Sequence, residues 1–187
     1  SQLTADDTVE VWGPLGNGFS LTPTPHLMMV AGGIGQTPFP AVARAILGQR
    51  HYGVQQSAIS NQQSSHTTHD SPLTTHVSLC YGVRSATYLA GLDDFRALGV
   101  DVAISTDDGS AGHHGFVTDL VRQSLDRRDP PTRLLGCGPE PMMHALAQLA
   151  AAASVPCELS LETPMACGIG ACFSCVAKIR QDDGHWD

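Results

Sequence analysis

The sequence predicts an α/β fold, in which five parallel strands form a doubly wound sheet. Five short apolar segments alternate with four segments of helical spacing between residues 26 and 162. Strands that alternate with helices form parallel sheets with right-handed crossovers, and helices then cover both faces. A second observation supports this: three of the apolar segments end in glycine-rich or acidic loops, as strands do where such sheets bind ligands.

The first strand and helix are separated from the rest by a polar stretch. HLMMVAGG at 26–33 is apolar and ends in glycines, and a helix follows over 38–47, because Thr37 can cap it and proline is tolerated in a first helical turn. Residues 55–76 are rich in Gln, Ser, Thr and His and offer almost nothing to bury. We expect an inserted surface loop, whose histidines are solvated rather than metal-bound.

The remaining elements continue the alternation. Leu89, Leu92, Phe95 and Leu98 step by three, which predicts a helix. In the later helix segment, Met142 and Met143 are expected to face the core. Strands are predicted at 76–85, 100–106, 132–138 and 155–162, and helices at 89–99, 116–125 and 139–153.

Composition limits the classes of function. The chain has 187 residues, of which 42% are hydrophobic and 15% charged, as in ordinary globular proteins. A net charge of −8 argues against nucleic acid or anionic membranes as partners, since both require clustered Lys and Arg. No apolar run reaches the length of a membrane span and no signal peptide is recognisable, so we expect a cytoplasmic protein. Six cysteines are then ligands or buried thiols rather than disulfides.

Three loops at strand ends predict a nucleotide site. AGGIGQTP (31–38), STDDGSAG (105–112) and GCGPEPM (136–142) each follow a predicted strand, so they meet at one edge of the sheet. In the first loop, glycines allow the backbone to approach a pyrophosphate, and the next helix offers free N–H groups. Pro38 stands where the dinucleotide fingerprint has its third glycine, so this is not an ordinary Rossmann turn.

The second loop bears on the choice of nucleotide. Asp107 and Asp108 end a strand, where a carboxylate can bond the hydroxyls of a ribose. Two negative charges would repel a 2′-phosphate, which favours NAD over NADP. An acidic turn with no ligand remains the alternative.

The cysteine segment predicts an iron–sulfur cluster. Cys167, Cys172 and Cys175 have the spacing C-x4-C-x2-C of plant-type [2Fe–2S] ferredoxins, whose fourth cysteine lies further on. Zinc and unliganded thiols are the alternatives. No cysteine follows Cys175, and although His185 could ligate, we expect the fourth ligand beyond the given sequence, which would then be a piece of a longer protein.

Six motifs in this order resemble one protein family. They resemble the electron-transfer subunits of NAD-linked, two-subunit dihydroorotate dehydrogenases, within the ferredoxin-reductase superfamily. The resemblance covers nearly the whole chain except the polar loop. The motifs are GPLGNGF (13–19), AGGIGQTP (31–38), YGVRS (81–85), STDDGSAGHHGFVTD (105–119), GCGPEPM (136–142) and CGIGACFSC (167–175).

The resemblance implies an electron relay. Dihydroorotate would be oxidised at FMN on a separate catalytic subunit, within a heterotetramer, and electrons would pass through the [2Fe–2S] cluster and FAD to NAD⁺. The chain would be an oxidoreductase component without a catalytic residue of its own, and inactive when isolated. Cofactor contacts would be Asn17, Gly18, Phe19, Gly32, Gly33, Gly35, Thr37, Pro38, Tyr81, Thr106, Asp107, Asp108, Cys137, Gly138 and Pro139, and the metal ligands Cys167, Cys172 and Cys175.

The resemblance also implies a domain division. Residues 1–22 would be the junction with a flavin-binding barrel expected before Ser1, residues 23–162 the NAD-binding domain, and residues 163–187 the incomplete cluster segment. Thr163 and Pro164 stand where the family commonly has a charged pair. Two alternatives share these motifs: a diaphorase-like NAD(P)H reductase subunit of a hydrogenase, sulfite reductase or glutamate synthase, and a non-catalytic redox-sensing module.

Overall fold

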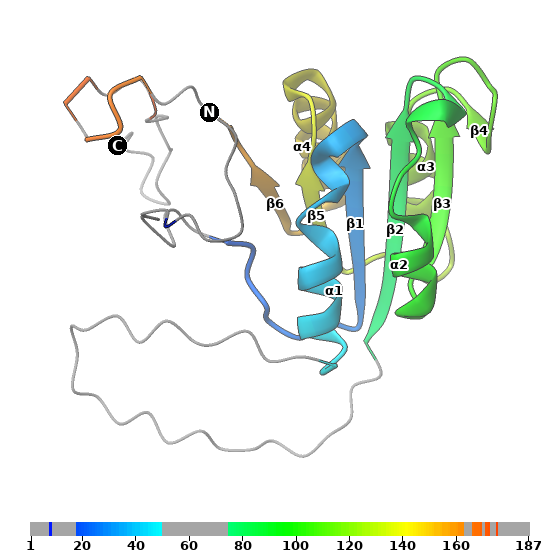
Figure 1. The fold of residues 1–187 in the computed structure, drawn as a ribbon. Coiled ribbons are helices and arrows are strands. Elements are labelled where there is room, and N and C mark those ends of the chain that lie inside the picture. The colour runs from blue at the N-terminus through cyan, green and yellow to red at the C-terminus, as the bar shows by residue number, and fades with distance from the viewer. Residues whose placement is uncertain are drawn as a thin grey trace, which may run out of the picture.

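The computed structural model describes Thr8 and residues 18–49, 75–162, 166–169, 171–172 and 175. Six parallel strands form one sheet in the order β4-β3-β2-β1-β5-β6 (Figure 1). The strands are β1 (His26–Gly32), β2 (His76–Val83), β3 (Asp101–Thr106), β4 (His113–His114), β5 (Arg133–Cys137) and β6 (Cys157–Ser160). The helices are α1 (Phe39–Ile46), α2 (Leu92–Ala97), α3 (Val117–Leu125) and α4 (Glu140–Ala153), with 3-10 turns η1 (Gly33–Gln36) and η2 (Ala86–Tyr88).

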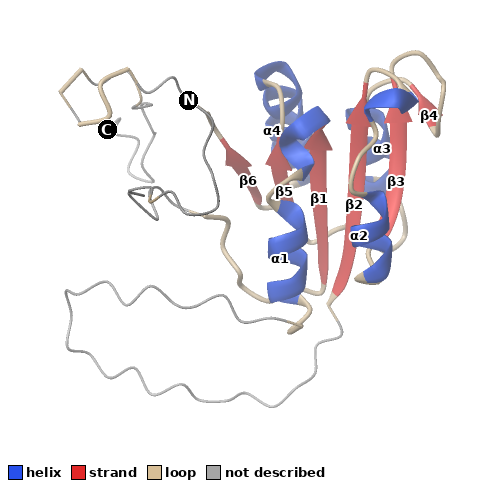
Figure 2. Ribbon diagram, viewed as in Figure 1, coloured by secondary structure: helices blue, strands red, loops and turns tan. Residues whose placement is uncertain are grey.

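Different helices cover the two faces of the sheet. In the view of Figure 2, α1 and α2 lie in front of the strands and α3 and α4 behind them. Each pair packs on its own core, the first containing Phe39 and Phe95 and the second Val121 and Leu146. The chain runs from β1 outward to β3 and then returns to place β5 on the other side of β1. This reversal leaves a crevice above β1 and β5, where such sheets bind ligands.

The parallel α/β sheet predicted from the sequence is confirmed, with one short strand added. The sequence predicts a glycine-rich loop with solvated histidines at His113 and His114, and the structure places these two residues in the short strand β4. Gly112 precedes them with φ +64°, and a Cβ there would lie 2.1 Å from the Ile104 carbonyl oxygen. This close approach presses the chain against β3 and lets it pair. His113 is half-buried, 3.6 Å from a carboxylate oxygen of Asp119, and His114 is exposed.

Two other elements differ from their predicted bounds. α2 is shorter than the predicted helix at 89–99, because Gly91 adopts the left-handed conformation (φ +70°) immediately before Leu92. The predicted polar loop at 55–76 lies outside the described residues except for Thr75 and His76. His76 begins β2, and its Nε2 atom is 2.8 Å from Asp101 Oδ2.

The centre of the fold is apolar as predicted. All seven residues of β1 are buried, and Met143 of α4 is 5% exposed. Burial raises the pKa of the Cys80 thiol to about 12 and that of Cys157 to about 11, which fits their expected role as small apolar side chains.

None of the helices within the described ranges is long and apolar enough to cross a membrane.

A buried arginine holds the segment before β1 against the sheet. Arg133 of β5 donates hydrogen bonds to the carbonyl oxygens of Ser20 (2.7 Å) and Thr22 (3.0 Å), and its guanidinium also pairs with Glu158 of β6. The other oxygen of Glu158 accepts the Ser20 N–H at 2.9 Å. Because the guanidinium is nearly buried, its positive charge requires this set of acceptors.

A glycine substitution tests the packing of the crevice. A Cβ at Gly35 would lie 2.1 Å from the Cys137 carbonyl oxygen, so the Gly35→Ala substitution must displace backbone. We expect it to lower the free energy of unfolding by about 1–3 kcal/mol, measured by urea denaturation. Gly136→Ala would contact the flexible ends of Leu146 and Leu159 and should cost less. Gly18→Ala, whose Cβ would have nothing within 4 Å, is the control. Equal losses of unfolding free energy in the three variants would contradict this packing.

His26 should make stability depend on pH. Burial first, and then the nearby His76 ring, lower the pKa of His26 below its usual 6.5. Above pH 6.5 the ring is neutral in both states, and its contribution is fully present. As the pH falls through 6.5 toward the lowered pKa, the unfolded chain binds a proton that the folded chain resists, so stability falls.

This dependence can be separated from that of the other histidines. Denaturation midpoints measured between pH 7.5 and 5.5 should fall less steeply in His26→Gln, whose amide can still bond Ser78 as the Nε2 atom does at 3.0 Å. An unchanged slope in that variant would show that His26 titrates normally.

Candidate functional site

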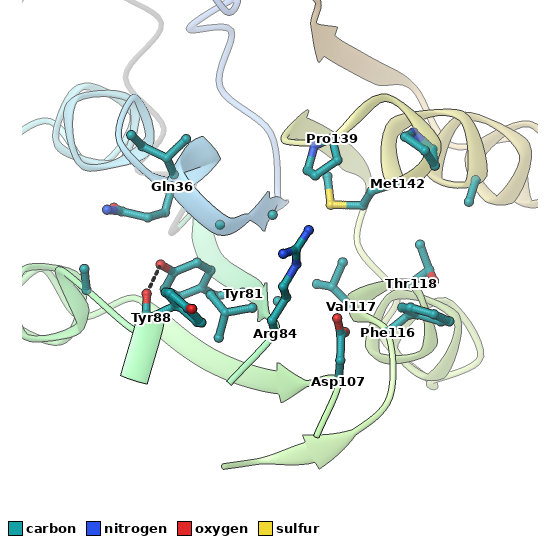
Figure 3. A pocket seen from close by; sticks show the side chains of 18 residues that line it. Gln36, Tyr81, Arg84, Tyr88, Asp107, Phe116, Val117, Thr118, Pro139 and Met142 are labelled. Atoms are coloured by element: carbon teal, nitrogen blue, oxygen red, sulfur yellow. Dashed lines mark hydrogen bonds between the residues drawn. The ribbon is translucent and has the colours of Figure 1, made fainter. Parts of the chain in front are cut away.

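A pocket of about 880 Å³ opens at the carboxyl edge of the sheet. Its floor comes from the ends of β1 and β2, and its walls from η2, the loop after β3, and the first turns of α3 and α4 (Figure 3). The pocket therefore lies where the strand order reverses. The lining residues are Gly32, Gly33, Ile34, Gln36, Tyr81, Gly82, Val83, Arg84, Tyr88, Ala90, Asp107, Phe116, Val117, Thr118, Pro139, Pro141, Met142 and Ala145.

The part of the pocket floor that β1 contributes is bare backbone, because side chains would not fit there. A Cβ at Gly32 would lie 2.6 Å from the Pro139 ring and 2.8 Å from the Met142 sulfur. Gly138 has φ +158°, and a Cβ there would lie 2.9 Å from the Gly32 nitrogen. The loops after β1 and β5 thus meet with their backbones in contact, and they leave the N–H groups near Gly33 accessible to a ligand.

Two opposite charges point into the pocket. The side chains of Arg84, at the end of β2, and Asp107, at the end of β3, are both directed into it (Figure 3). Both are exposed, and within the described ranges neither is in an ion pair. The rim adds exposed apolar groups, Ile34, Tyr88 and Phe116. A ligand with both anionic and hydroxyl groups and a flat apolar part matches this lining.

The structure divides the predicted cofactor contacts into two groups. Five line the pocket: Gly32, Gly33, Tyr81, Asp107 and Pro139. Seven lie near it without lining it: Gly35, Thr37, Pro38, Thr106, Asp108, Cys137 and Gly138. The last three lie elsewhere: Gly18 is in the segment before β1, Phe19 stacks on Phe39 with ring centroids 5.6 Å apart, and Asn17 is outside the described residues.

Sequence reasoning missed several lining residues. Arg84 lies in the quoted YGVRS motif, at a strand end, and this position could have marked it. Met142 packs against the second core cluster, as predicted, but its half-buried side chain also lines the pocket, whereas Met143 is buried. Gln36, Tyr88, Phe116 and Thr118 lie on turns or helix starts whose direction no periodic pattern reveals.

Cys137 ends β5 just beneath the pocket. Its side chain is 7% exposed, and burial raises the pKa of the thiol despite a hydrogen bond with Ser160. The thiol is therefore protonated at neutral pH. It can act as a packing group or a weak hydrogen-bond donor near the pocket, but not as a nucleophile.

The chemistry of the cysteine segment suits metal binding. Cys167 Sγ accepts the Ala171 N–H at 3.3 Å. Hydrogen bonds from the Ile169 backbone and from Cys172 lower the pKa of Cys167 to about 6, which favours the thiolate that metals require. Across the described residues, no three His, Cys, Asp or Glu side chains are gathered closely enough to hold a metal ion. The donor types fit a cluster, while a gathered ligand set is not seen in the described positions.

Comparison with known families places the chain in one of them. Residues 29–148 match the model of the oxidoreductase NAD-binding domain, so the chain belongs to that family. Residues 162–186 match a second model, described as the iron–sulfur cluster binding domain of dihydroorotate dehydrogenase B.

Individual curated relatives show which proteins within this family the chain resembles. The chain is 33% identical over 184 residues to the electron transfer subunit of dihydroorotate dehydrogenase B (NAD⁺) from Caldanaerobacter subterraneus, covering 98% of this chain and 62% of that protein. It is 34% identical over 182 residues to the subunit of the same name from Bacillus caldolyticus, covering 96% and 59%. These matches confirm the resemblance found in the motifs. The chain spans about three fifths of the length of these relatives.

Solved structures share the fold. An NADH-dependent reduced ferredoxin–NADP oxidoreductase, described for flavin-based electron bifurcation, is 25% identical, with a TM-score of 0.66 over 91% of this chain and 52% of that one. The C-terminal domain of a hydrogenase from Pyrococcus furiosus has a TM-score of 0.55 at 11% identity, over 80% of this chain and all of that one. The second likeness shows the fold alone.

Arg84 provides a direct test of the pocket. We expect Arg84→Ala to weaken NADH binding by about 10- to 100-fold, because a hydrogen bond to a charged group is worth about 1.5–3 kcal/mol. Arg84→Lys should recover part of the loss, since it keeps the charge without the planar fork. Titration calorimetry measures both. Arg96→Ala, which removes an exposed arginine paired with Asp93 on α2, is the matched control. Unchanged affinity in Arg84→Ala would exclude this pocket as the NAD site.

Proposed function

We propose that this chain is the NAD-binding and cluster-bearing part of an electron-transfer subunit of an NAD-linked dihydroorotate dehydrogenase, acting in pyrimidine biosynthesis. The observation that carries the proposal is the presence, on one chain, of a switch-point pocket and a segment matching the iron–sulfur model of that enzyme. The names of the curated relatives agree with it. We also propose a cytoplasmic setting, in which the six free cysteines would stay reduced.

The pocket residues have separate roles in holding NAD. Gly32 and Gly33 allow the pyrophosphate to approach the backbone, and the Arg84 guanidinium supplies the opposite charge. Asp107 accepts hydrogen bonds from ribose hydroxyls and disfavours a 2′-phosphate. The exposed Tyr88 and Phe116 rings offer flat apolar surfaces for the bases.

The chemistry at this pocket is mainly positioning. Among the described lining residues there is no pair of a nucleophile and a base, and the nearby Cys137 thiol is protonated. When bound, FAD and a [2Fe–2S] cluster would supply the hydride and single-electron chemistry. The chain's own residues orient NAD, and Cys167, Cys172 and Cys175 are proposed as three of the cluster ligands.

This division of labour assigns dihydroorotate to a partner. Oxidation of dihydroorotate requires a base and an electron acceptor beside the substrate, whereas the charged groups of the described pocket, Arg84 and Asp107, are proposed to be engaged by the nucleotide. We propose an FMN-containing catalytic subunit as that partner, in a heterotetramer, and little or no activity for the 187-residue chain alone.

A diaphorase-like role is the second candidate. The 25% identical solved neighbour is an NADH-dependent ferredoxin–NADP oxidoreductase, which shows that this fold also serves other electron-transfer partners. The two roles share the nucleotide loops and differ in the partner surface. Reconstitution with the FMN subunit separates them.

Three preparations assayed side by side test the proposal. The 187-residue chain alone should not oxidise dihydroorotate and should show little NADH oxidation with dyes. A full-length protein of its relatives' size, loaded with FAD, should reduce dyes with NADH. Only addition of the FMN subunit should add dihydroorotate oxidation. If the flavin-free 187-residue chain oxidised dihydroorotate with NAD⁺, an unassigned catalytic centre would have to exist within it.

The metal content is a separate test. The full-length protein, purified without oxygen, should be brown and contain about two irons and two sulfides per chain, as the ligand spacing predicts. Cys172→Ser should remove most of the iron, whereas Cys157→Ser, which changes a half-buried thiol of β6, should not. A colourless protein with stoichiometric zinc would contradict the cluster.

A further inference from the structure

Two adjacent loops form one wall of the pocket, and hydrogen bonds join them. The loop after β2 carries Arg84 and Tyr88, and the loop after β3 carries Asp107. The N–H groups of Asp107 and Asp108 bond the carbonyls of Val83 (3.1 Å) and Arg84 (3.2 Å), which continues the strand pairing beyond the sheet.

Ser110 joins the loops through its side chain, since its Oγ atom lies 3.5 Å from Ser85 Oγ and also contacts the Ala86 backbone. The Ala86 N–H donates to Ser110 Oγ at 2.7 Å. A serine hydroxyl has one hydrogen, and that hydrogen is directed to Asp108 Oδ1, 2.5 Å away. The same carboxylate oxygen accepts the Ser110 N–H at 3.0 Å. The carboxylate thus fixes the orientation of the hydroxyl, so that an oxygen lone pair meets the Ala86 N–H.

The two neighbouring aspartates therefore face different partners. Asp107 lines the pocket, whereas Asp108 does not and is engaged by its own loop. Hydrogen bonds from the Ser110 side chain and N–H lower the pKa of Asp108, so its carboxylate stays charged at any pH near neutral.

We propose that Asp108 and Ser110 are positioning residues, which lock the loop after β2 so that Arg84 and Tyr88 face the nucleotide, and that Asp107 alone determines selectivity at the ribose. This inference rests on the proposed NAD function. The sequence favours both Asp107 and Asp108 as groups at the ribose, whereas this inference gives that role to Asp107 alone. The Asp108–Ser110–Ala86 chain is called the loop latch below. Tyr81 adds a second attachment, because its hydroxyl donates to the Tyr88 carbonyl at 3.4 Å (Figure 3).

The kinetic test uses the full-length, FAD-loaded protein, with NADH and NADPH as alternative donors to a dye. Asp108→Ala and Ser110→Ala should each raise KM for NADH by about fivefold, the effect of one net hydrogen bond, and leave kcat nearly unchanged. The double variant should be no worse than either single one, because both break the same chain of bonds. The ratio of kcat/KM for NADH over NADPH should be unchanged in all three.

The neighbouring residues supply the controls. Asp107→Ser should lower the ratio of kcat/KM for NADH over NADPH. Asp108→Asn keeps an acceptor oxygen, so it should retain most of the NADH affinity that Asp108→Ala loses. Asp94→Ala removes an exposed charge on α2 and should change nothing. A loss of NADH preference in Asp108→Ala as large as that in Asp107→Ser, or additive losses in the double variant, would overturn the proposal.

A measurement without nucleotide separates the latch from the proposed function. Hydrogen exchange of the Ala86 amide should be about fivefold or more faster in Asp108→Ala and Ser110→Ala than in the unmodified protein, and unchanged in Asp107→Ser. Unchanged exchange in the first two would overturn the latch. If exchange responds as expected but the unmodified protein binds no NAD(H), the latch stands as a structural feature and the proposed function fails instead.

Discussion

The close contact between the loops that follow β1 and β5 determines the shape of the site. Gly35 lies against the Cys137 carbonyl, and Gly138 lies against the Gly32 nitrogen, at distances that exclude a Cβ. β1 is the strand between β2 and β5, and it is buried throughout. Because two backbones meet there without side chains between them, this part of the crevice floor consists of peptide groups, and a ligand can approach N–H donors directly.

Two charged side chains in the pocket add to the backbone surface that the glycines expose. The chain has a net charge of −8, so an anionic ligand is repelled by the protein as a whole and needs a local positive group. Arg84 is that group, and the Asp107 carboxylate lies in the same pocket, at the end of the neighbouring strand. Their separation is set by backbone bonds between the two loops and not by an ion pair. A dinucleotide, which has phosphates and ribose hydroxyls along its length, matches such an arrangement of fixed, unpaired charges.

Much of this could be predicted from the sequence, and the remainder has identifiable physical reasons. The alternation of apolar and helical segments determines a parallel sheet, and the glycines after strands indicate its ligand edge, because both signals are local. β4 was missed because a two-residue strand has no pattern of its own and depends on the contact of Gly112 with Ile104. The different roles of Asp107 and Asp108 depend on the direction of two side chains in one turn. Met142 and Met143 differ in the same way, since one residue along a helix changes the face by about 100°.

The parallel direction of β6 explains how one sheet can serve both the nucleotide and the cysteine segment. β6 pairs in parallel with β5, so its carboxyl end is at the same edge of the sheet as the pocket, and the cysteine segment follows β6 in the sequence. An antiparallel last strand would have released the cysteines at the opposite edge, about one strand length away. The β6 register is held by Glu158, which bonds Arg133 of β5 and the Ser20 N–H of the segment before β1. The buried Arg133 therefore fixes the segment before β1 and strand β6 relative to each other, next to the strand that leads into the pocket.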